Sequence, residues 1–235
     1  LSHMTYSIPG RISVIDRDND GEADHMYVSD TGGQLFRLDI YNGESGSDFI
    51  KGARIADFGG DTEETNRRFY YGPDVTEIAL GDELYYAVAL GSGWRASPLD
   101  TVVDDNFYML KDSGVFKRDE NGKYTYMTTV TESKMYNATS HALNSSDENE
   151  RALAAAAFAN KDGWYLNLTT NGEKVLSSPL IIDYKVFFTT YVPAVSSTSA
   201  CAPPTGSSRA YLVSMFNGNA VTDVNNDGEV NGDDR

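Results

Sequence analysis

The feature that most constrains the fold of this chain is a repeated arrangement of short apolar strands separated by turns. Three passages follow one plan: a short apolar strand, a turn, a second apolar strand, a loop, and a third strand that ends in a turn. They begin at RISVID (11–16), DVTEIAL (74–80) and SPLIID (178–183). Each third strand alternates an aromatic with an aliphatic residue: Phe36 with Leu38, Tyr108 with Leu110, and Tyr211 with Val213. This period of two predicts strands with one buried face.

A fourth strand for each unit is predicted in ARIADF (53–58), KYTYMTTV (123–130) and WYLNLT (164–169). Antiparallel sets of four strands, bounded by Gly, Asn and Asp turns, are typical of β-propeller blades. Propellers close with about four to eight blades, and the chain holds three clear units. We therefore predict an all-β fold, a modified β-propeller or part of one, built from four-stranded antiparallel blades. The alternative is a β-sandwich with irregular loops.

Two insertions interrupt the repeat. Residues 60–72 are polar and then aromatic, which predicts a surface loop that returns to the sheet. Residues 131–162 contain one short helix, expected near 147–160. Asp147 or Ser146 can cap it, Glu150 follows Asp147 at capping-box spacing, and a run of alanines favours the helical conformation. We expect this helix to pack across a blade edge.

Composition restricts the partners. The formal net charge is −16, whereas binding to nucleic acid needs a basic face. The same charge disfavours anionic membrane surfaces, and no apolar run reaches the roughly 18–20 residues that cross a bilayer. Cys201 has no second cysteine to pair with in this sequence. It is expected to be a bystander, or half of a bridge to a residue outside the sequence.

The first candidate site is the acidic stretch DRDNDGEAD at 16–24. Calcium takes six to eight oxygen ligands, and an Asp-x-Asp-x-Asp-Gly loop can wrap them around one point. The predicted ligands are the side chains of Asp16, Asp18, Asp20 and Asp24 and the carbonyl of Glu22. Tyr27 stands where an EF-hand has its bidentate Glu, so this is not an EF-hand. A solvated acidic turn is the alternative, but four clustered carboxylates repel one another unless a cation neutralises them.

The second candidate site is DVNNDGEVNGDD at 223–234. It resembles a dockerin-type half-motif with Asp in place of Glu at position twelve. Its predicted ligands are the side chains of Asp223, Asn225, Asp227, Asn231 and Asp234 and the carbonyl of Glu229. No helix follows it in the sequence, so we expect weaker calcium binding here. The predicted organisation is a vector scar at 1–4, a propeller-type domain at 5–220 and the calcium loop at 221–235.

Several blocks occur in one order over about 7–220 and resemble the C-terminal region of the PilY/PilC family. They are DRDNDGEADHMYVSDTGGQLFRLDI, RRFYYGPDV, ALGSGWRASPLD with NFYMLKD, GWYLNL with GEKVLSSPLI, and VFFTTYVP with SSRAYLVSMFNG. This family comprises type IV pilus tip adhesins and biogenesis factors of Gram-negative bacteria. The resemblance implies a modified β-propeller with calcium bound at 16–24. The chain is shorter than a whole family propeller, it has no RGD motif, and its terminal loop is not a feature that the family predicts.

The resemblance also implies a function. We expect a non-enzymatic, calcium-binding domain that supports the balance of pilus assembly and retraction, twitching motility and surface attachment. The implied partners are minor pilins or other pilus tip components, and a receptor on a host cell or an abiotic surface. The implied location is extracellular, at the pilus tip or the outer-membrane surface, with no direct membrane span.

Two other classes of protein share single features with this sequence. GGQLFRLD (32–39) is similar to the repeat of quinoprotein dehydrogenases, whose propellers hold a quinone with calcium. Such a site needs a Cys pair or Trp platform and a free Asp base, whereas this chain has one Cys. A carbohydrate-binding or cellulosome-type module is suggested by the terminal loop, but Trp94 and Trp164 are expected to be core residues. His25 and His141 have no nucleophilic constellation around them and are expected to be structural.

Overall fold

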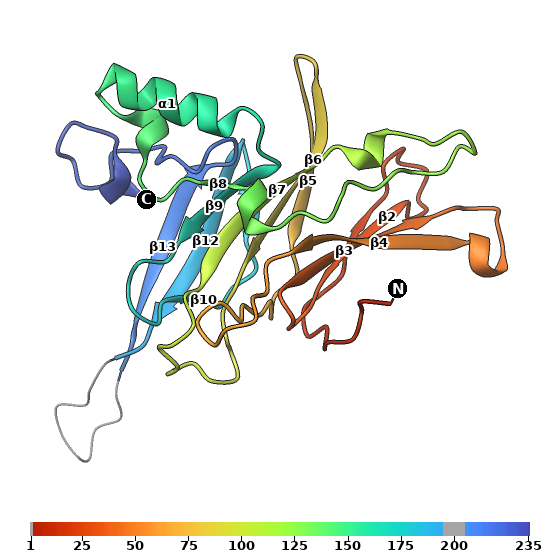
Figure 1. Cartoon of the computed structure of the whole chain (residues 1–235), viewed down its shortest axis with the longest axis horizontal. Coiled ribbons are helices and arrows are strands. Elements are labelled where there is room, and N and C mark those ends of the chain that lie inside the picture. Colours follow the sequence, from red (N-terminus) through yellow and green to blue (C-terminus); the bar gives the residue numbers. More distant parts are fainter. Residues whose placement is uncertain (1, 195–204) are drawn as a thin grey trace.

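A computed structural model describes residues 2–194 and 205–235, so Cys201 lies outside the described residues. The fold consists of three sheets side by side and one short α-helix (Figure 1). The N-terminal sheet is an antiparallel meander. Its strands, in spatial order, are β1 (Ser13–Ile15), β2 (His25–Ser29), β3 (Gln34–Ile40) and β4 (Ile50–Asp57).

The central sheet and the C-terminal sheet follow along the chain. The central sheet has the spatial order β5 (Asp74–Leu80), β6 (Glu83–Gly91), β7 (Asn106–Asp112), β9 (Gly163–Asn167) and β8 (Tyr136–Asn137), with β8 parallel to β9. The C-terminal sheet contains β10 (Lys174–Val175), β11 (Leu180–Ile182), β12 (Lys185–Val192) and β13 (Ser207–Ser214). Strand β13 pairs with the whole length of β12, and the short strands β10 and β11 share the other edge of β12.

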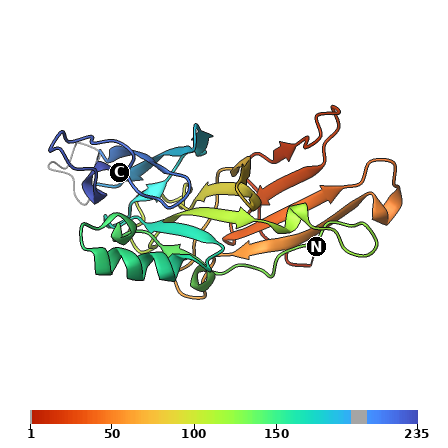
Figure 2. The ribbon, with the colours of Figure 1, turned by 90° about the horizontal axis from the view of Figure 1, so that it is seen from above.

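The helices are short. They are α1 (Glu148–Phe158) and the 3-10 helices η1 (Gly46–Asp48), η2 (Gly114–Phe116), η3 (Glu132–Lys134), η4 (Ala142–Asn144) and η5 (Gly232–Asp234). Figure 2 shows α1 and the N-terminal sheet toward opposite ends of the molecule. Among the described helices, none combines the length and the apolar character needed to cross a membrane.

The central sheet is buried on both faces, and its alternating residues serve two cores. Tyr108 and Leu110 of β7 belong to the apolar cluster shared with the N-terminal sheet. Phe107 and Met109 belong to the cluster shared with the C-terminal sheet, where the Phe107 ring stacks on Phe188 at 3.9 Å between ring centroids. The period of two in the sequence thus places side chains on opposite faces of β7, as predicted.

The all-β fold of successive antiparallel sheets is confirmed, and the described residues do not close a ring of blades. ARIADF forms the end of β4, as predicted for a fourth strand. WYLNLT also contains a strand, β9, but β9 pairs with β7 in the central sheet rather than with the third repeat. In the third repeat, β11 is the predicted first strand. The short strand β10 pairs with the same edge of β12 and stands in place of the predicted fourth strand.

The predicted strand at KYTYMTTV is wrong. Tyr124 and Val130 make only isolated bridges, and Val130 exchanges backbone hydrogen bonds with β4 through Ile55 and Asp57. The alternation that suggested a strand has another cause: the Tyr124 ring packs edge-on against His25, and the Tyr126 ring lies under the guanidinium of Arg37 at 4.5 Å. The segment therefore crosses between two sheets and covers buried polar side chains.

The predicted helix is confirmed with slightly different bounds, 148–158 rather than 147–160. Asp147 is the N-cap, because its carboxylate accepts the N–H groups of Asn149 and Glu150 at 2.8 and 3.4 Å. The Glu150 carboxylate accepts the Ser145 hydroxyl, so the reciprocal capping-box bond is replaced by one to an earlier residue. Phe158 packs edge-on against Tyr136 of β8, which places the helix along the edge of the central sheet.

A buried ionic network joins the N-terminal sheet to the central sheet. The guanidinium of Arg37 in β3 donates to both carboxylate oxygens of Asp112 in β7, at 2.9 and 2.8 Å, and to Asp39 at 3.0 Å. All three side chains are fully buried. Burial alone would raise the pKa of Asp39, but a hydrogen bond from His25 and the charge of Arg37 lower it below its usual value. Arg37 thus neutralises carboxylates from two sheets.

We predict that Arg37→Met destabilises the fold by about 3–5 kcal/mol, because it leaves buried carboxylates without their partner. Chemical denaturation of the purified chain measures this change. Lys51→Met is the control, since the Lys51–Asp48 pair is exposed and solvent screening leaves such pairs with little effect on stability. Equal losses in the two variants would show that the buried network has no special role.

Candidate metal site

The loop at 16–24 connects β1 to β2 and turns its own carboxylates inward. Asn19 and Gly21 adopt positive φ angles of 61° and 91°, which produces the sharp reversal. Asp16 accepts the N–H groups of Gly21 at 2.9 Å and Asp20 at 3.2 Å. Asp18 and Asp20 each accept the N–H two residues on, from Asp20 at 3.3 Å and Glu22 at 2.8 Å, which is the pattern of Asx turns. The loop therefore has a defined shape that the alternating aspartates themselves stabilise.

Three of the predicted ligands converge. Asp16, Asp18 and Asp24 each offer a carboxylate oxygen, and these oxygens lie within 4.8 Å of one another. Two oxygens on opposite sides of a calcium ion, each about 2.4 Å from it, would be separated by about 4.8 Å. Carboxylates are also the hard ligands that calcium prefers, and like charges this close favour a bound cation. The donor set and its spacing fit calcium.

Asp20 lies outside this group of three. Its Oδ1 accepts the N–H of Glu22 at 2.8 Å, which closes the turn at Gly21. The predicted roles of Asp20 and of the Glu22 carbonyl as metal ligands stay predictions.

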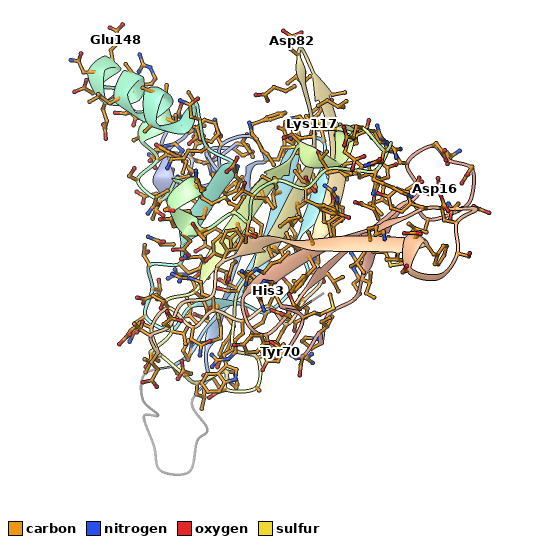
Figure 3. The ribbon with its side chains drawn as sticks, turned by 45° about the vertical axis from the view of Figure 1, so that its right-hand side comes forward. His3, Asp16, Tyr70, Asp82, Lys117 and Glu148 are labelled. Atoms are coloured by element: carbon orange, nitrogen blue, oxygen red, sulfur yellow. The ribbon has the colours of Figure 1, made fainter. Side chains whose placement is uncertain are left out.

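Asp24 attaches the loop to the N-terminal sheet. Its N–H donates to the carbonyl of Ile15 at the end of β1, and its carbonyl accepts the N–H of Ile40 at the end of β3, both at 2.8 Å. Its carboxylate accepts the N–H of Arg17 at 2.8 Å. One converging carboxylate is therefore fixed in register with two strands. Figure 3 shows Asp16 at the outer side of the molecule, on the opposite side from Glu148 of α1.

Two cations that the sequence analysis did not associate with the loop lie beside it. A cavity of about 390 Å³ is lined by Asp18, Asp20 and Asp24 and by Arg118 and Lys123 from a distant turn. The guanidinium of Arg118 lies 3.6 Å from the centroid of the Tyr124 ring, and Lys123 lies over Tyr41. No sequence motif links this turn to the acidic loop. Arg118 donates to the carbonyl of Gly122 at 2.9 Å and Lys123 lies 3.7 Å from Glu44, so among the described residues neither forms an ion pair with the acidic loop.

The terminal loop repeats the conformation of the first. Asn226 and Gly228 have φ angles of 59° and 91°, nearly the same as those at the equivalent positions of the first loop. Asp223 accepts the N–H of Gly228, and Asp227 accepts the N–H of Glu229, both at 2.9 Å. The sequence similarity of the two loops thus corresponds to one shared turn.

The two loops differ in the residue that closes them. Asp234, at position twelve, accepts the N–H of Val224 at 2.8 Å, as Asp24, at position nine, accepts that of Arg17. A hydrogen bond from the Asn231 N–H lowers the pKa of Asp234, so this carboxylate is charged. The carboxylates of Asp223, Asp227 and Asp234 do not converge within 4.8 Å as those of the first loop do. The terminal loop relies on amide oxygens from Asn225 and Asn231 to complete its predicted ligand set.

The terminal loop is braced by residues distant in the sequence. The guanidinium of Arg235 donates to the carbonyls of Ala138 and Thr139 at 2.6 and 2.8 Å. The side chain of Asn144 donates to the carbonyl of Val230 at 3.0 Å. A segment far away in the sequence therefore supports the loop in place of a following helix.

The histidines are structural, as expected. His25 is buried with its Nδ1 at 2.7 Å from Asp39, and the buried His141 accepts the N–H of Ala220. Trp164 is a core residue, as predicted. The expectation for Trp94 is wrong: it is only partly buried, and the guanidinium of Arg68 stacks on its ring at 4.1 Å.

Comparison with known proteins bears on the fold and on the resemblance. No family model matches the chain. A curated "Type IV pilus biogenesis factor PilY1 homolog" from Xylella fastidiosa is 27% identical, over 94% of this chain and 15% of that protein. A solved structure, the C-terminal domain of Pseudomonas aeruginosa PilY1, matches with a TM-score of 0.60 at 17% identity, over 94% of this chain and 50% of that one.

The predicted resemblance to the C-terminal region of PilY1 proteins is confirmed by these two matches, and so is the fold class. The chain spans about half of the solved domain and a smaller part, 15%, of the curated relative.

We predict that Asp18→Asn weakens calcium binding by about tenfold or more, because it removes one of the three converging charges. The amide oxygen can still accept the N–H of Asp20, which the carboxylate accepts at 3.3 Å, so the turn should persist. Isothermal titration calorimetry measures the affinity. Asp61→Asn, which removes an exposed charge in the 60–72 loop, is the control. Equal binding by Asp18→Asn and wild type would reject the site.

The first loop should bind calcium more tightly than the terminal loop, because three of its carboxylates converge. Asp18→Asn should shift the tighter phase of a calcium titration to higher calcium concentration, and Asp227→Asn should shift the weaker phase. The reverse assignment, or a crystal with calcium only in the terminal loop, would contradict this ranking.

Proposed function

We propose that this chain is the calcium-binding C-terminal region of a type IV pilus biogenesis factor and tip adhesin. One observation carries the proposal: three aspartates converge in a loop that Asp24 attaches to two strands, in a domain similar to that of PilY1 proteins. In the whole protein, this region supports pilus assembly and retraction, twitching motility and attachment to surfaces. It acts outside the cell, at the pilus tip or the outer-membrane surface. Its partners are minor pilins or other tip components and a surface receptor.

Calcium acts by fixing the edge of the N-terminal sheet. A bound ion neutralises Asp16, Asp18 and Asp24 and holds β1 and β2 in register at the point where the loop joins them. Without the ion, the three carboxylates repel one another, and the backbone bonds of Asp24 oppose the opening of the loop. The expected result is a looser edge around β1, a strand of only three residues.

The affinity of the loop decides whether calcium is structural or regulatory. Calcium sites cover roughly 10⁻⁹–10⁻³ M, and those of extracellular modules lie near the weak end. A site of micromolar affinity is filled wherever calcium is near millimolar, and there it acts as a structural ion. Regulation requires weaker binding, or passage through a compartment poorer in calcium.

The proposed role is non-enzymatic. A quinone-dependent dehydrogenase needs an aspartate free to act as a base in a closed site beside its metal. Here Asp16 and Asp18 are exposed to solvent, and Asp24, which is half-buried, is bonded to the N–H of Arg17. These aspartates suit an ion at the surface of the domain.

The test uses the full-length protein in its own bacterium, with Asp24→Ala and Asp24→Lys. We expect Asp24→Ala to reduce surface pili and twitching, because the loop loses a calcium ligand. Asp24→Lys supplies a tethered positive charge in place of the ion and should preserve more function than Asp24→Ala. Asp61→Lys is the control for the change of charge. If both Asp24 variants match wild type, this loop does not control pilus function.

A further inference from the structure

A polar cavity of about 490 Å³ lies where the ends of β7 and β9 meet the loops around residues 67 and 170. Its volume is in the range of small-molecule sites. Such sites are usually lined by apolar side chains, whereas only Val103 and Leu168 are aliphatic among the residues that line this one. No predicted calcium ligand lines it. The cavity is thus suited to a hydrophilic ligand.

Glu132 is held in one orientation at the wall of this cavity. Its Oε1 accepts the hydroxyl of Tyr108 at 2.5 Å and the amide of Asn106 at 2.9 Å. The Nε of Arg67 lies 3.2 Å from the same oxygen. Within the described residues, these contacts all involve Oε1, and the Glu132 side chain is 30% exposed. The other carboxylate oxygen is therefore available to accept hydrogen bonds from a ligand.

Two more acceptors of the wall have no hydrogen-bond partner among the described residues. They are Oδ1 of Asn106 and Oδ2 of Asp105, and both residues are 1% exposed. Buried polar atoms without partners are rare in folded proteins, and a bound water can satisfy them. Both side chains are too buried to contact a ligand as they stand. Asn106 acts as a positioning residue, because its amide group holds Glu132.

The lining of the cavity carries more negative than positive side chains, which disfavours anionic ligands. Asp104, Asp105 and Glu132 carry carboxylates, against the single guanidinium of Arg67. Burial raises the pKa of Asp105 to about 6, so this group is largely ionised at neutral pH. A hydroxyl group can donate to a carboxylate and accept from a guanidinium. A neutral polyhydroxylated molecule therefore matches both kinds of group.

We propose that this cavity binds one unit of a neutral saccharide. Glu132 and the exposed Asn167 hydrogen-bond to its hydroxyl groups, and Arg67 donates to a hydroxyl oxygen. Tyr165, which is partly buried in β9 and lines the same cavity, offers an apolar ring with a polar tip to the C–H groups of the sugar. This site would give the domain a means of attachment that is independent of its calcium loops.

The test is a titration of the whole chain with N-acetylglucosamine, mannose, galactose and lactose. Saturation-transfer NMR detects the binding of each sugar. We expect at least one of these sugars to bind saturably. Glu132→Gln and Asn167→Ala should each weaken that binding by about tenfold or more, because each removes a hydrogen bond to the ligand. Asn149→Ala, at an exposed asparagine on α1, is the matched control and should bind as wild type does.

Asn167 is exposed, so its substitution tests the site even if Glu132→Gln disturbs the fold. Binding should persist in excess EDTA, which separates this proposal from the calcium proposal. The proposal is overturned if none of the four sugars binds. It is also overturned if sialic acid binds more tightly than the neutral sugars, or if Asn167→Ala and Glu132→Gln both bind as wild type does.

Discussion

The buried guanidinium of Arg37 is the interaction on which the arrangement of the N-terminal and central sheets depends. It contacts Asp39 beside it in β3 and both oxygens of Asp112 in β7. Apolar contacts are not directional, so they fix the relative position of two sheets less strictly than hydrogen bonds do. A guanidinium that bonds to carboxylates on both sheets restricts them to one relative position. Buried ion pairs often contribute little net stability because desolvation is costly. The main effect of Arg37 is therefore to select one arrangement of the two sheets. Removing it would lower the stability of the fold strongly, because the carboxylates of Asp39 and Asp112 would stay buried without a partner.

The acidic loop is built onto the same strands. Asp24 is followed directly by His25, which binds Asp39 of the buried network, and the Asp24 carbonyl accepts the N–H of Ile40. The loop is thus attached to a rigid part of the sheet at one end, while β1 at its other end is a short edge strand. Neutralising the carboxylates with calcium would therefore order β1 more than it orders the core. This coupling is the physical basis of the role proposed for calcium in pilus function.

The sequence predicted features that depend on local pattern. The alternation in 106–112 placed side chains on two faces of β7, and Asp147 capped the helix as expected. Long-range pairing was harder to predict, because strand partners are decided by packing between distant segments. WYLNLT contains a strand, but its partner β7 comes from another repeat. Tyr124 and Tyr126 alternate because they cover the Arg37 network. Arg118 and Arg235 lie beside acidic loops without any motif that links them in the sequence.

Amide hydrogen exchange with and without calcium tests the central claim most directly. Calcium should slow exchange at the amides of Arg17 and Gly21, which donate to Asp24 and Asp16, and at the amide of Asp24, which donates to Ile15 of β1. The amide of Phe188, in the C-terminal sheet, should exchange at the same rate in both conditions. This pattern would show that the ion orders the loop and the sheet edge that carries it. Saturating calcium that leaves the Arg17, Gly21 and Asp24 amides unchanged, or slows all amides equally, would contradict the account.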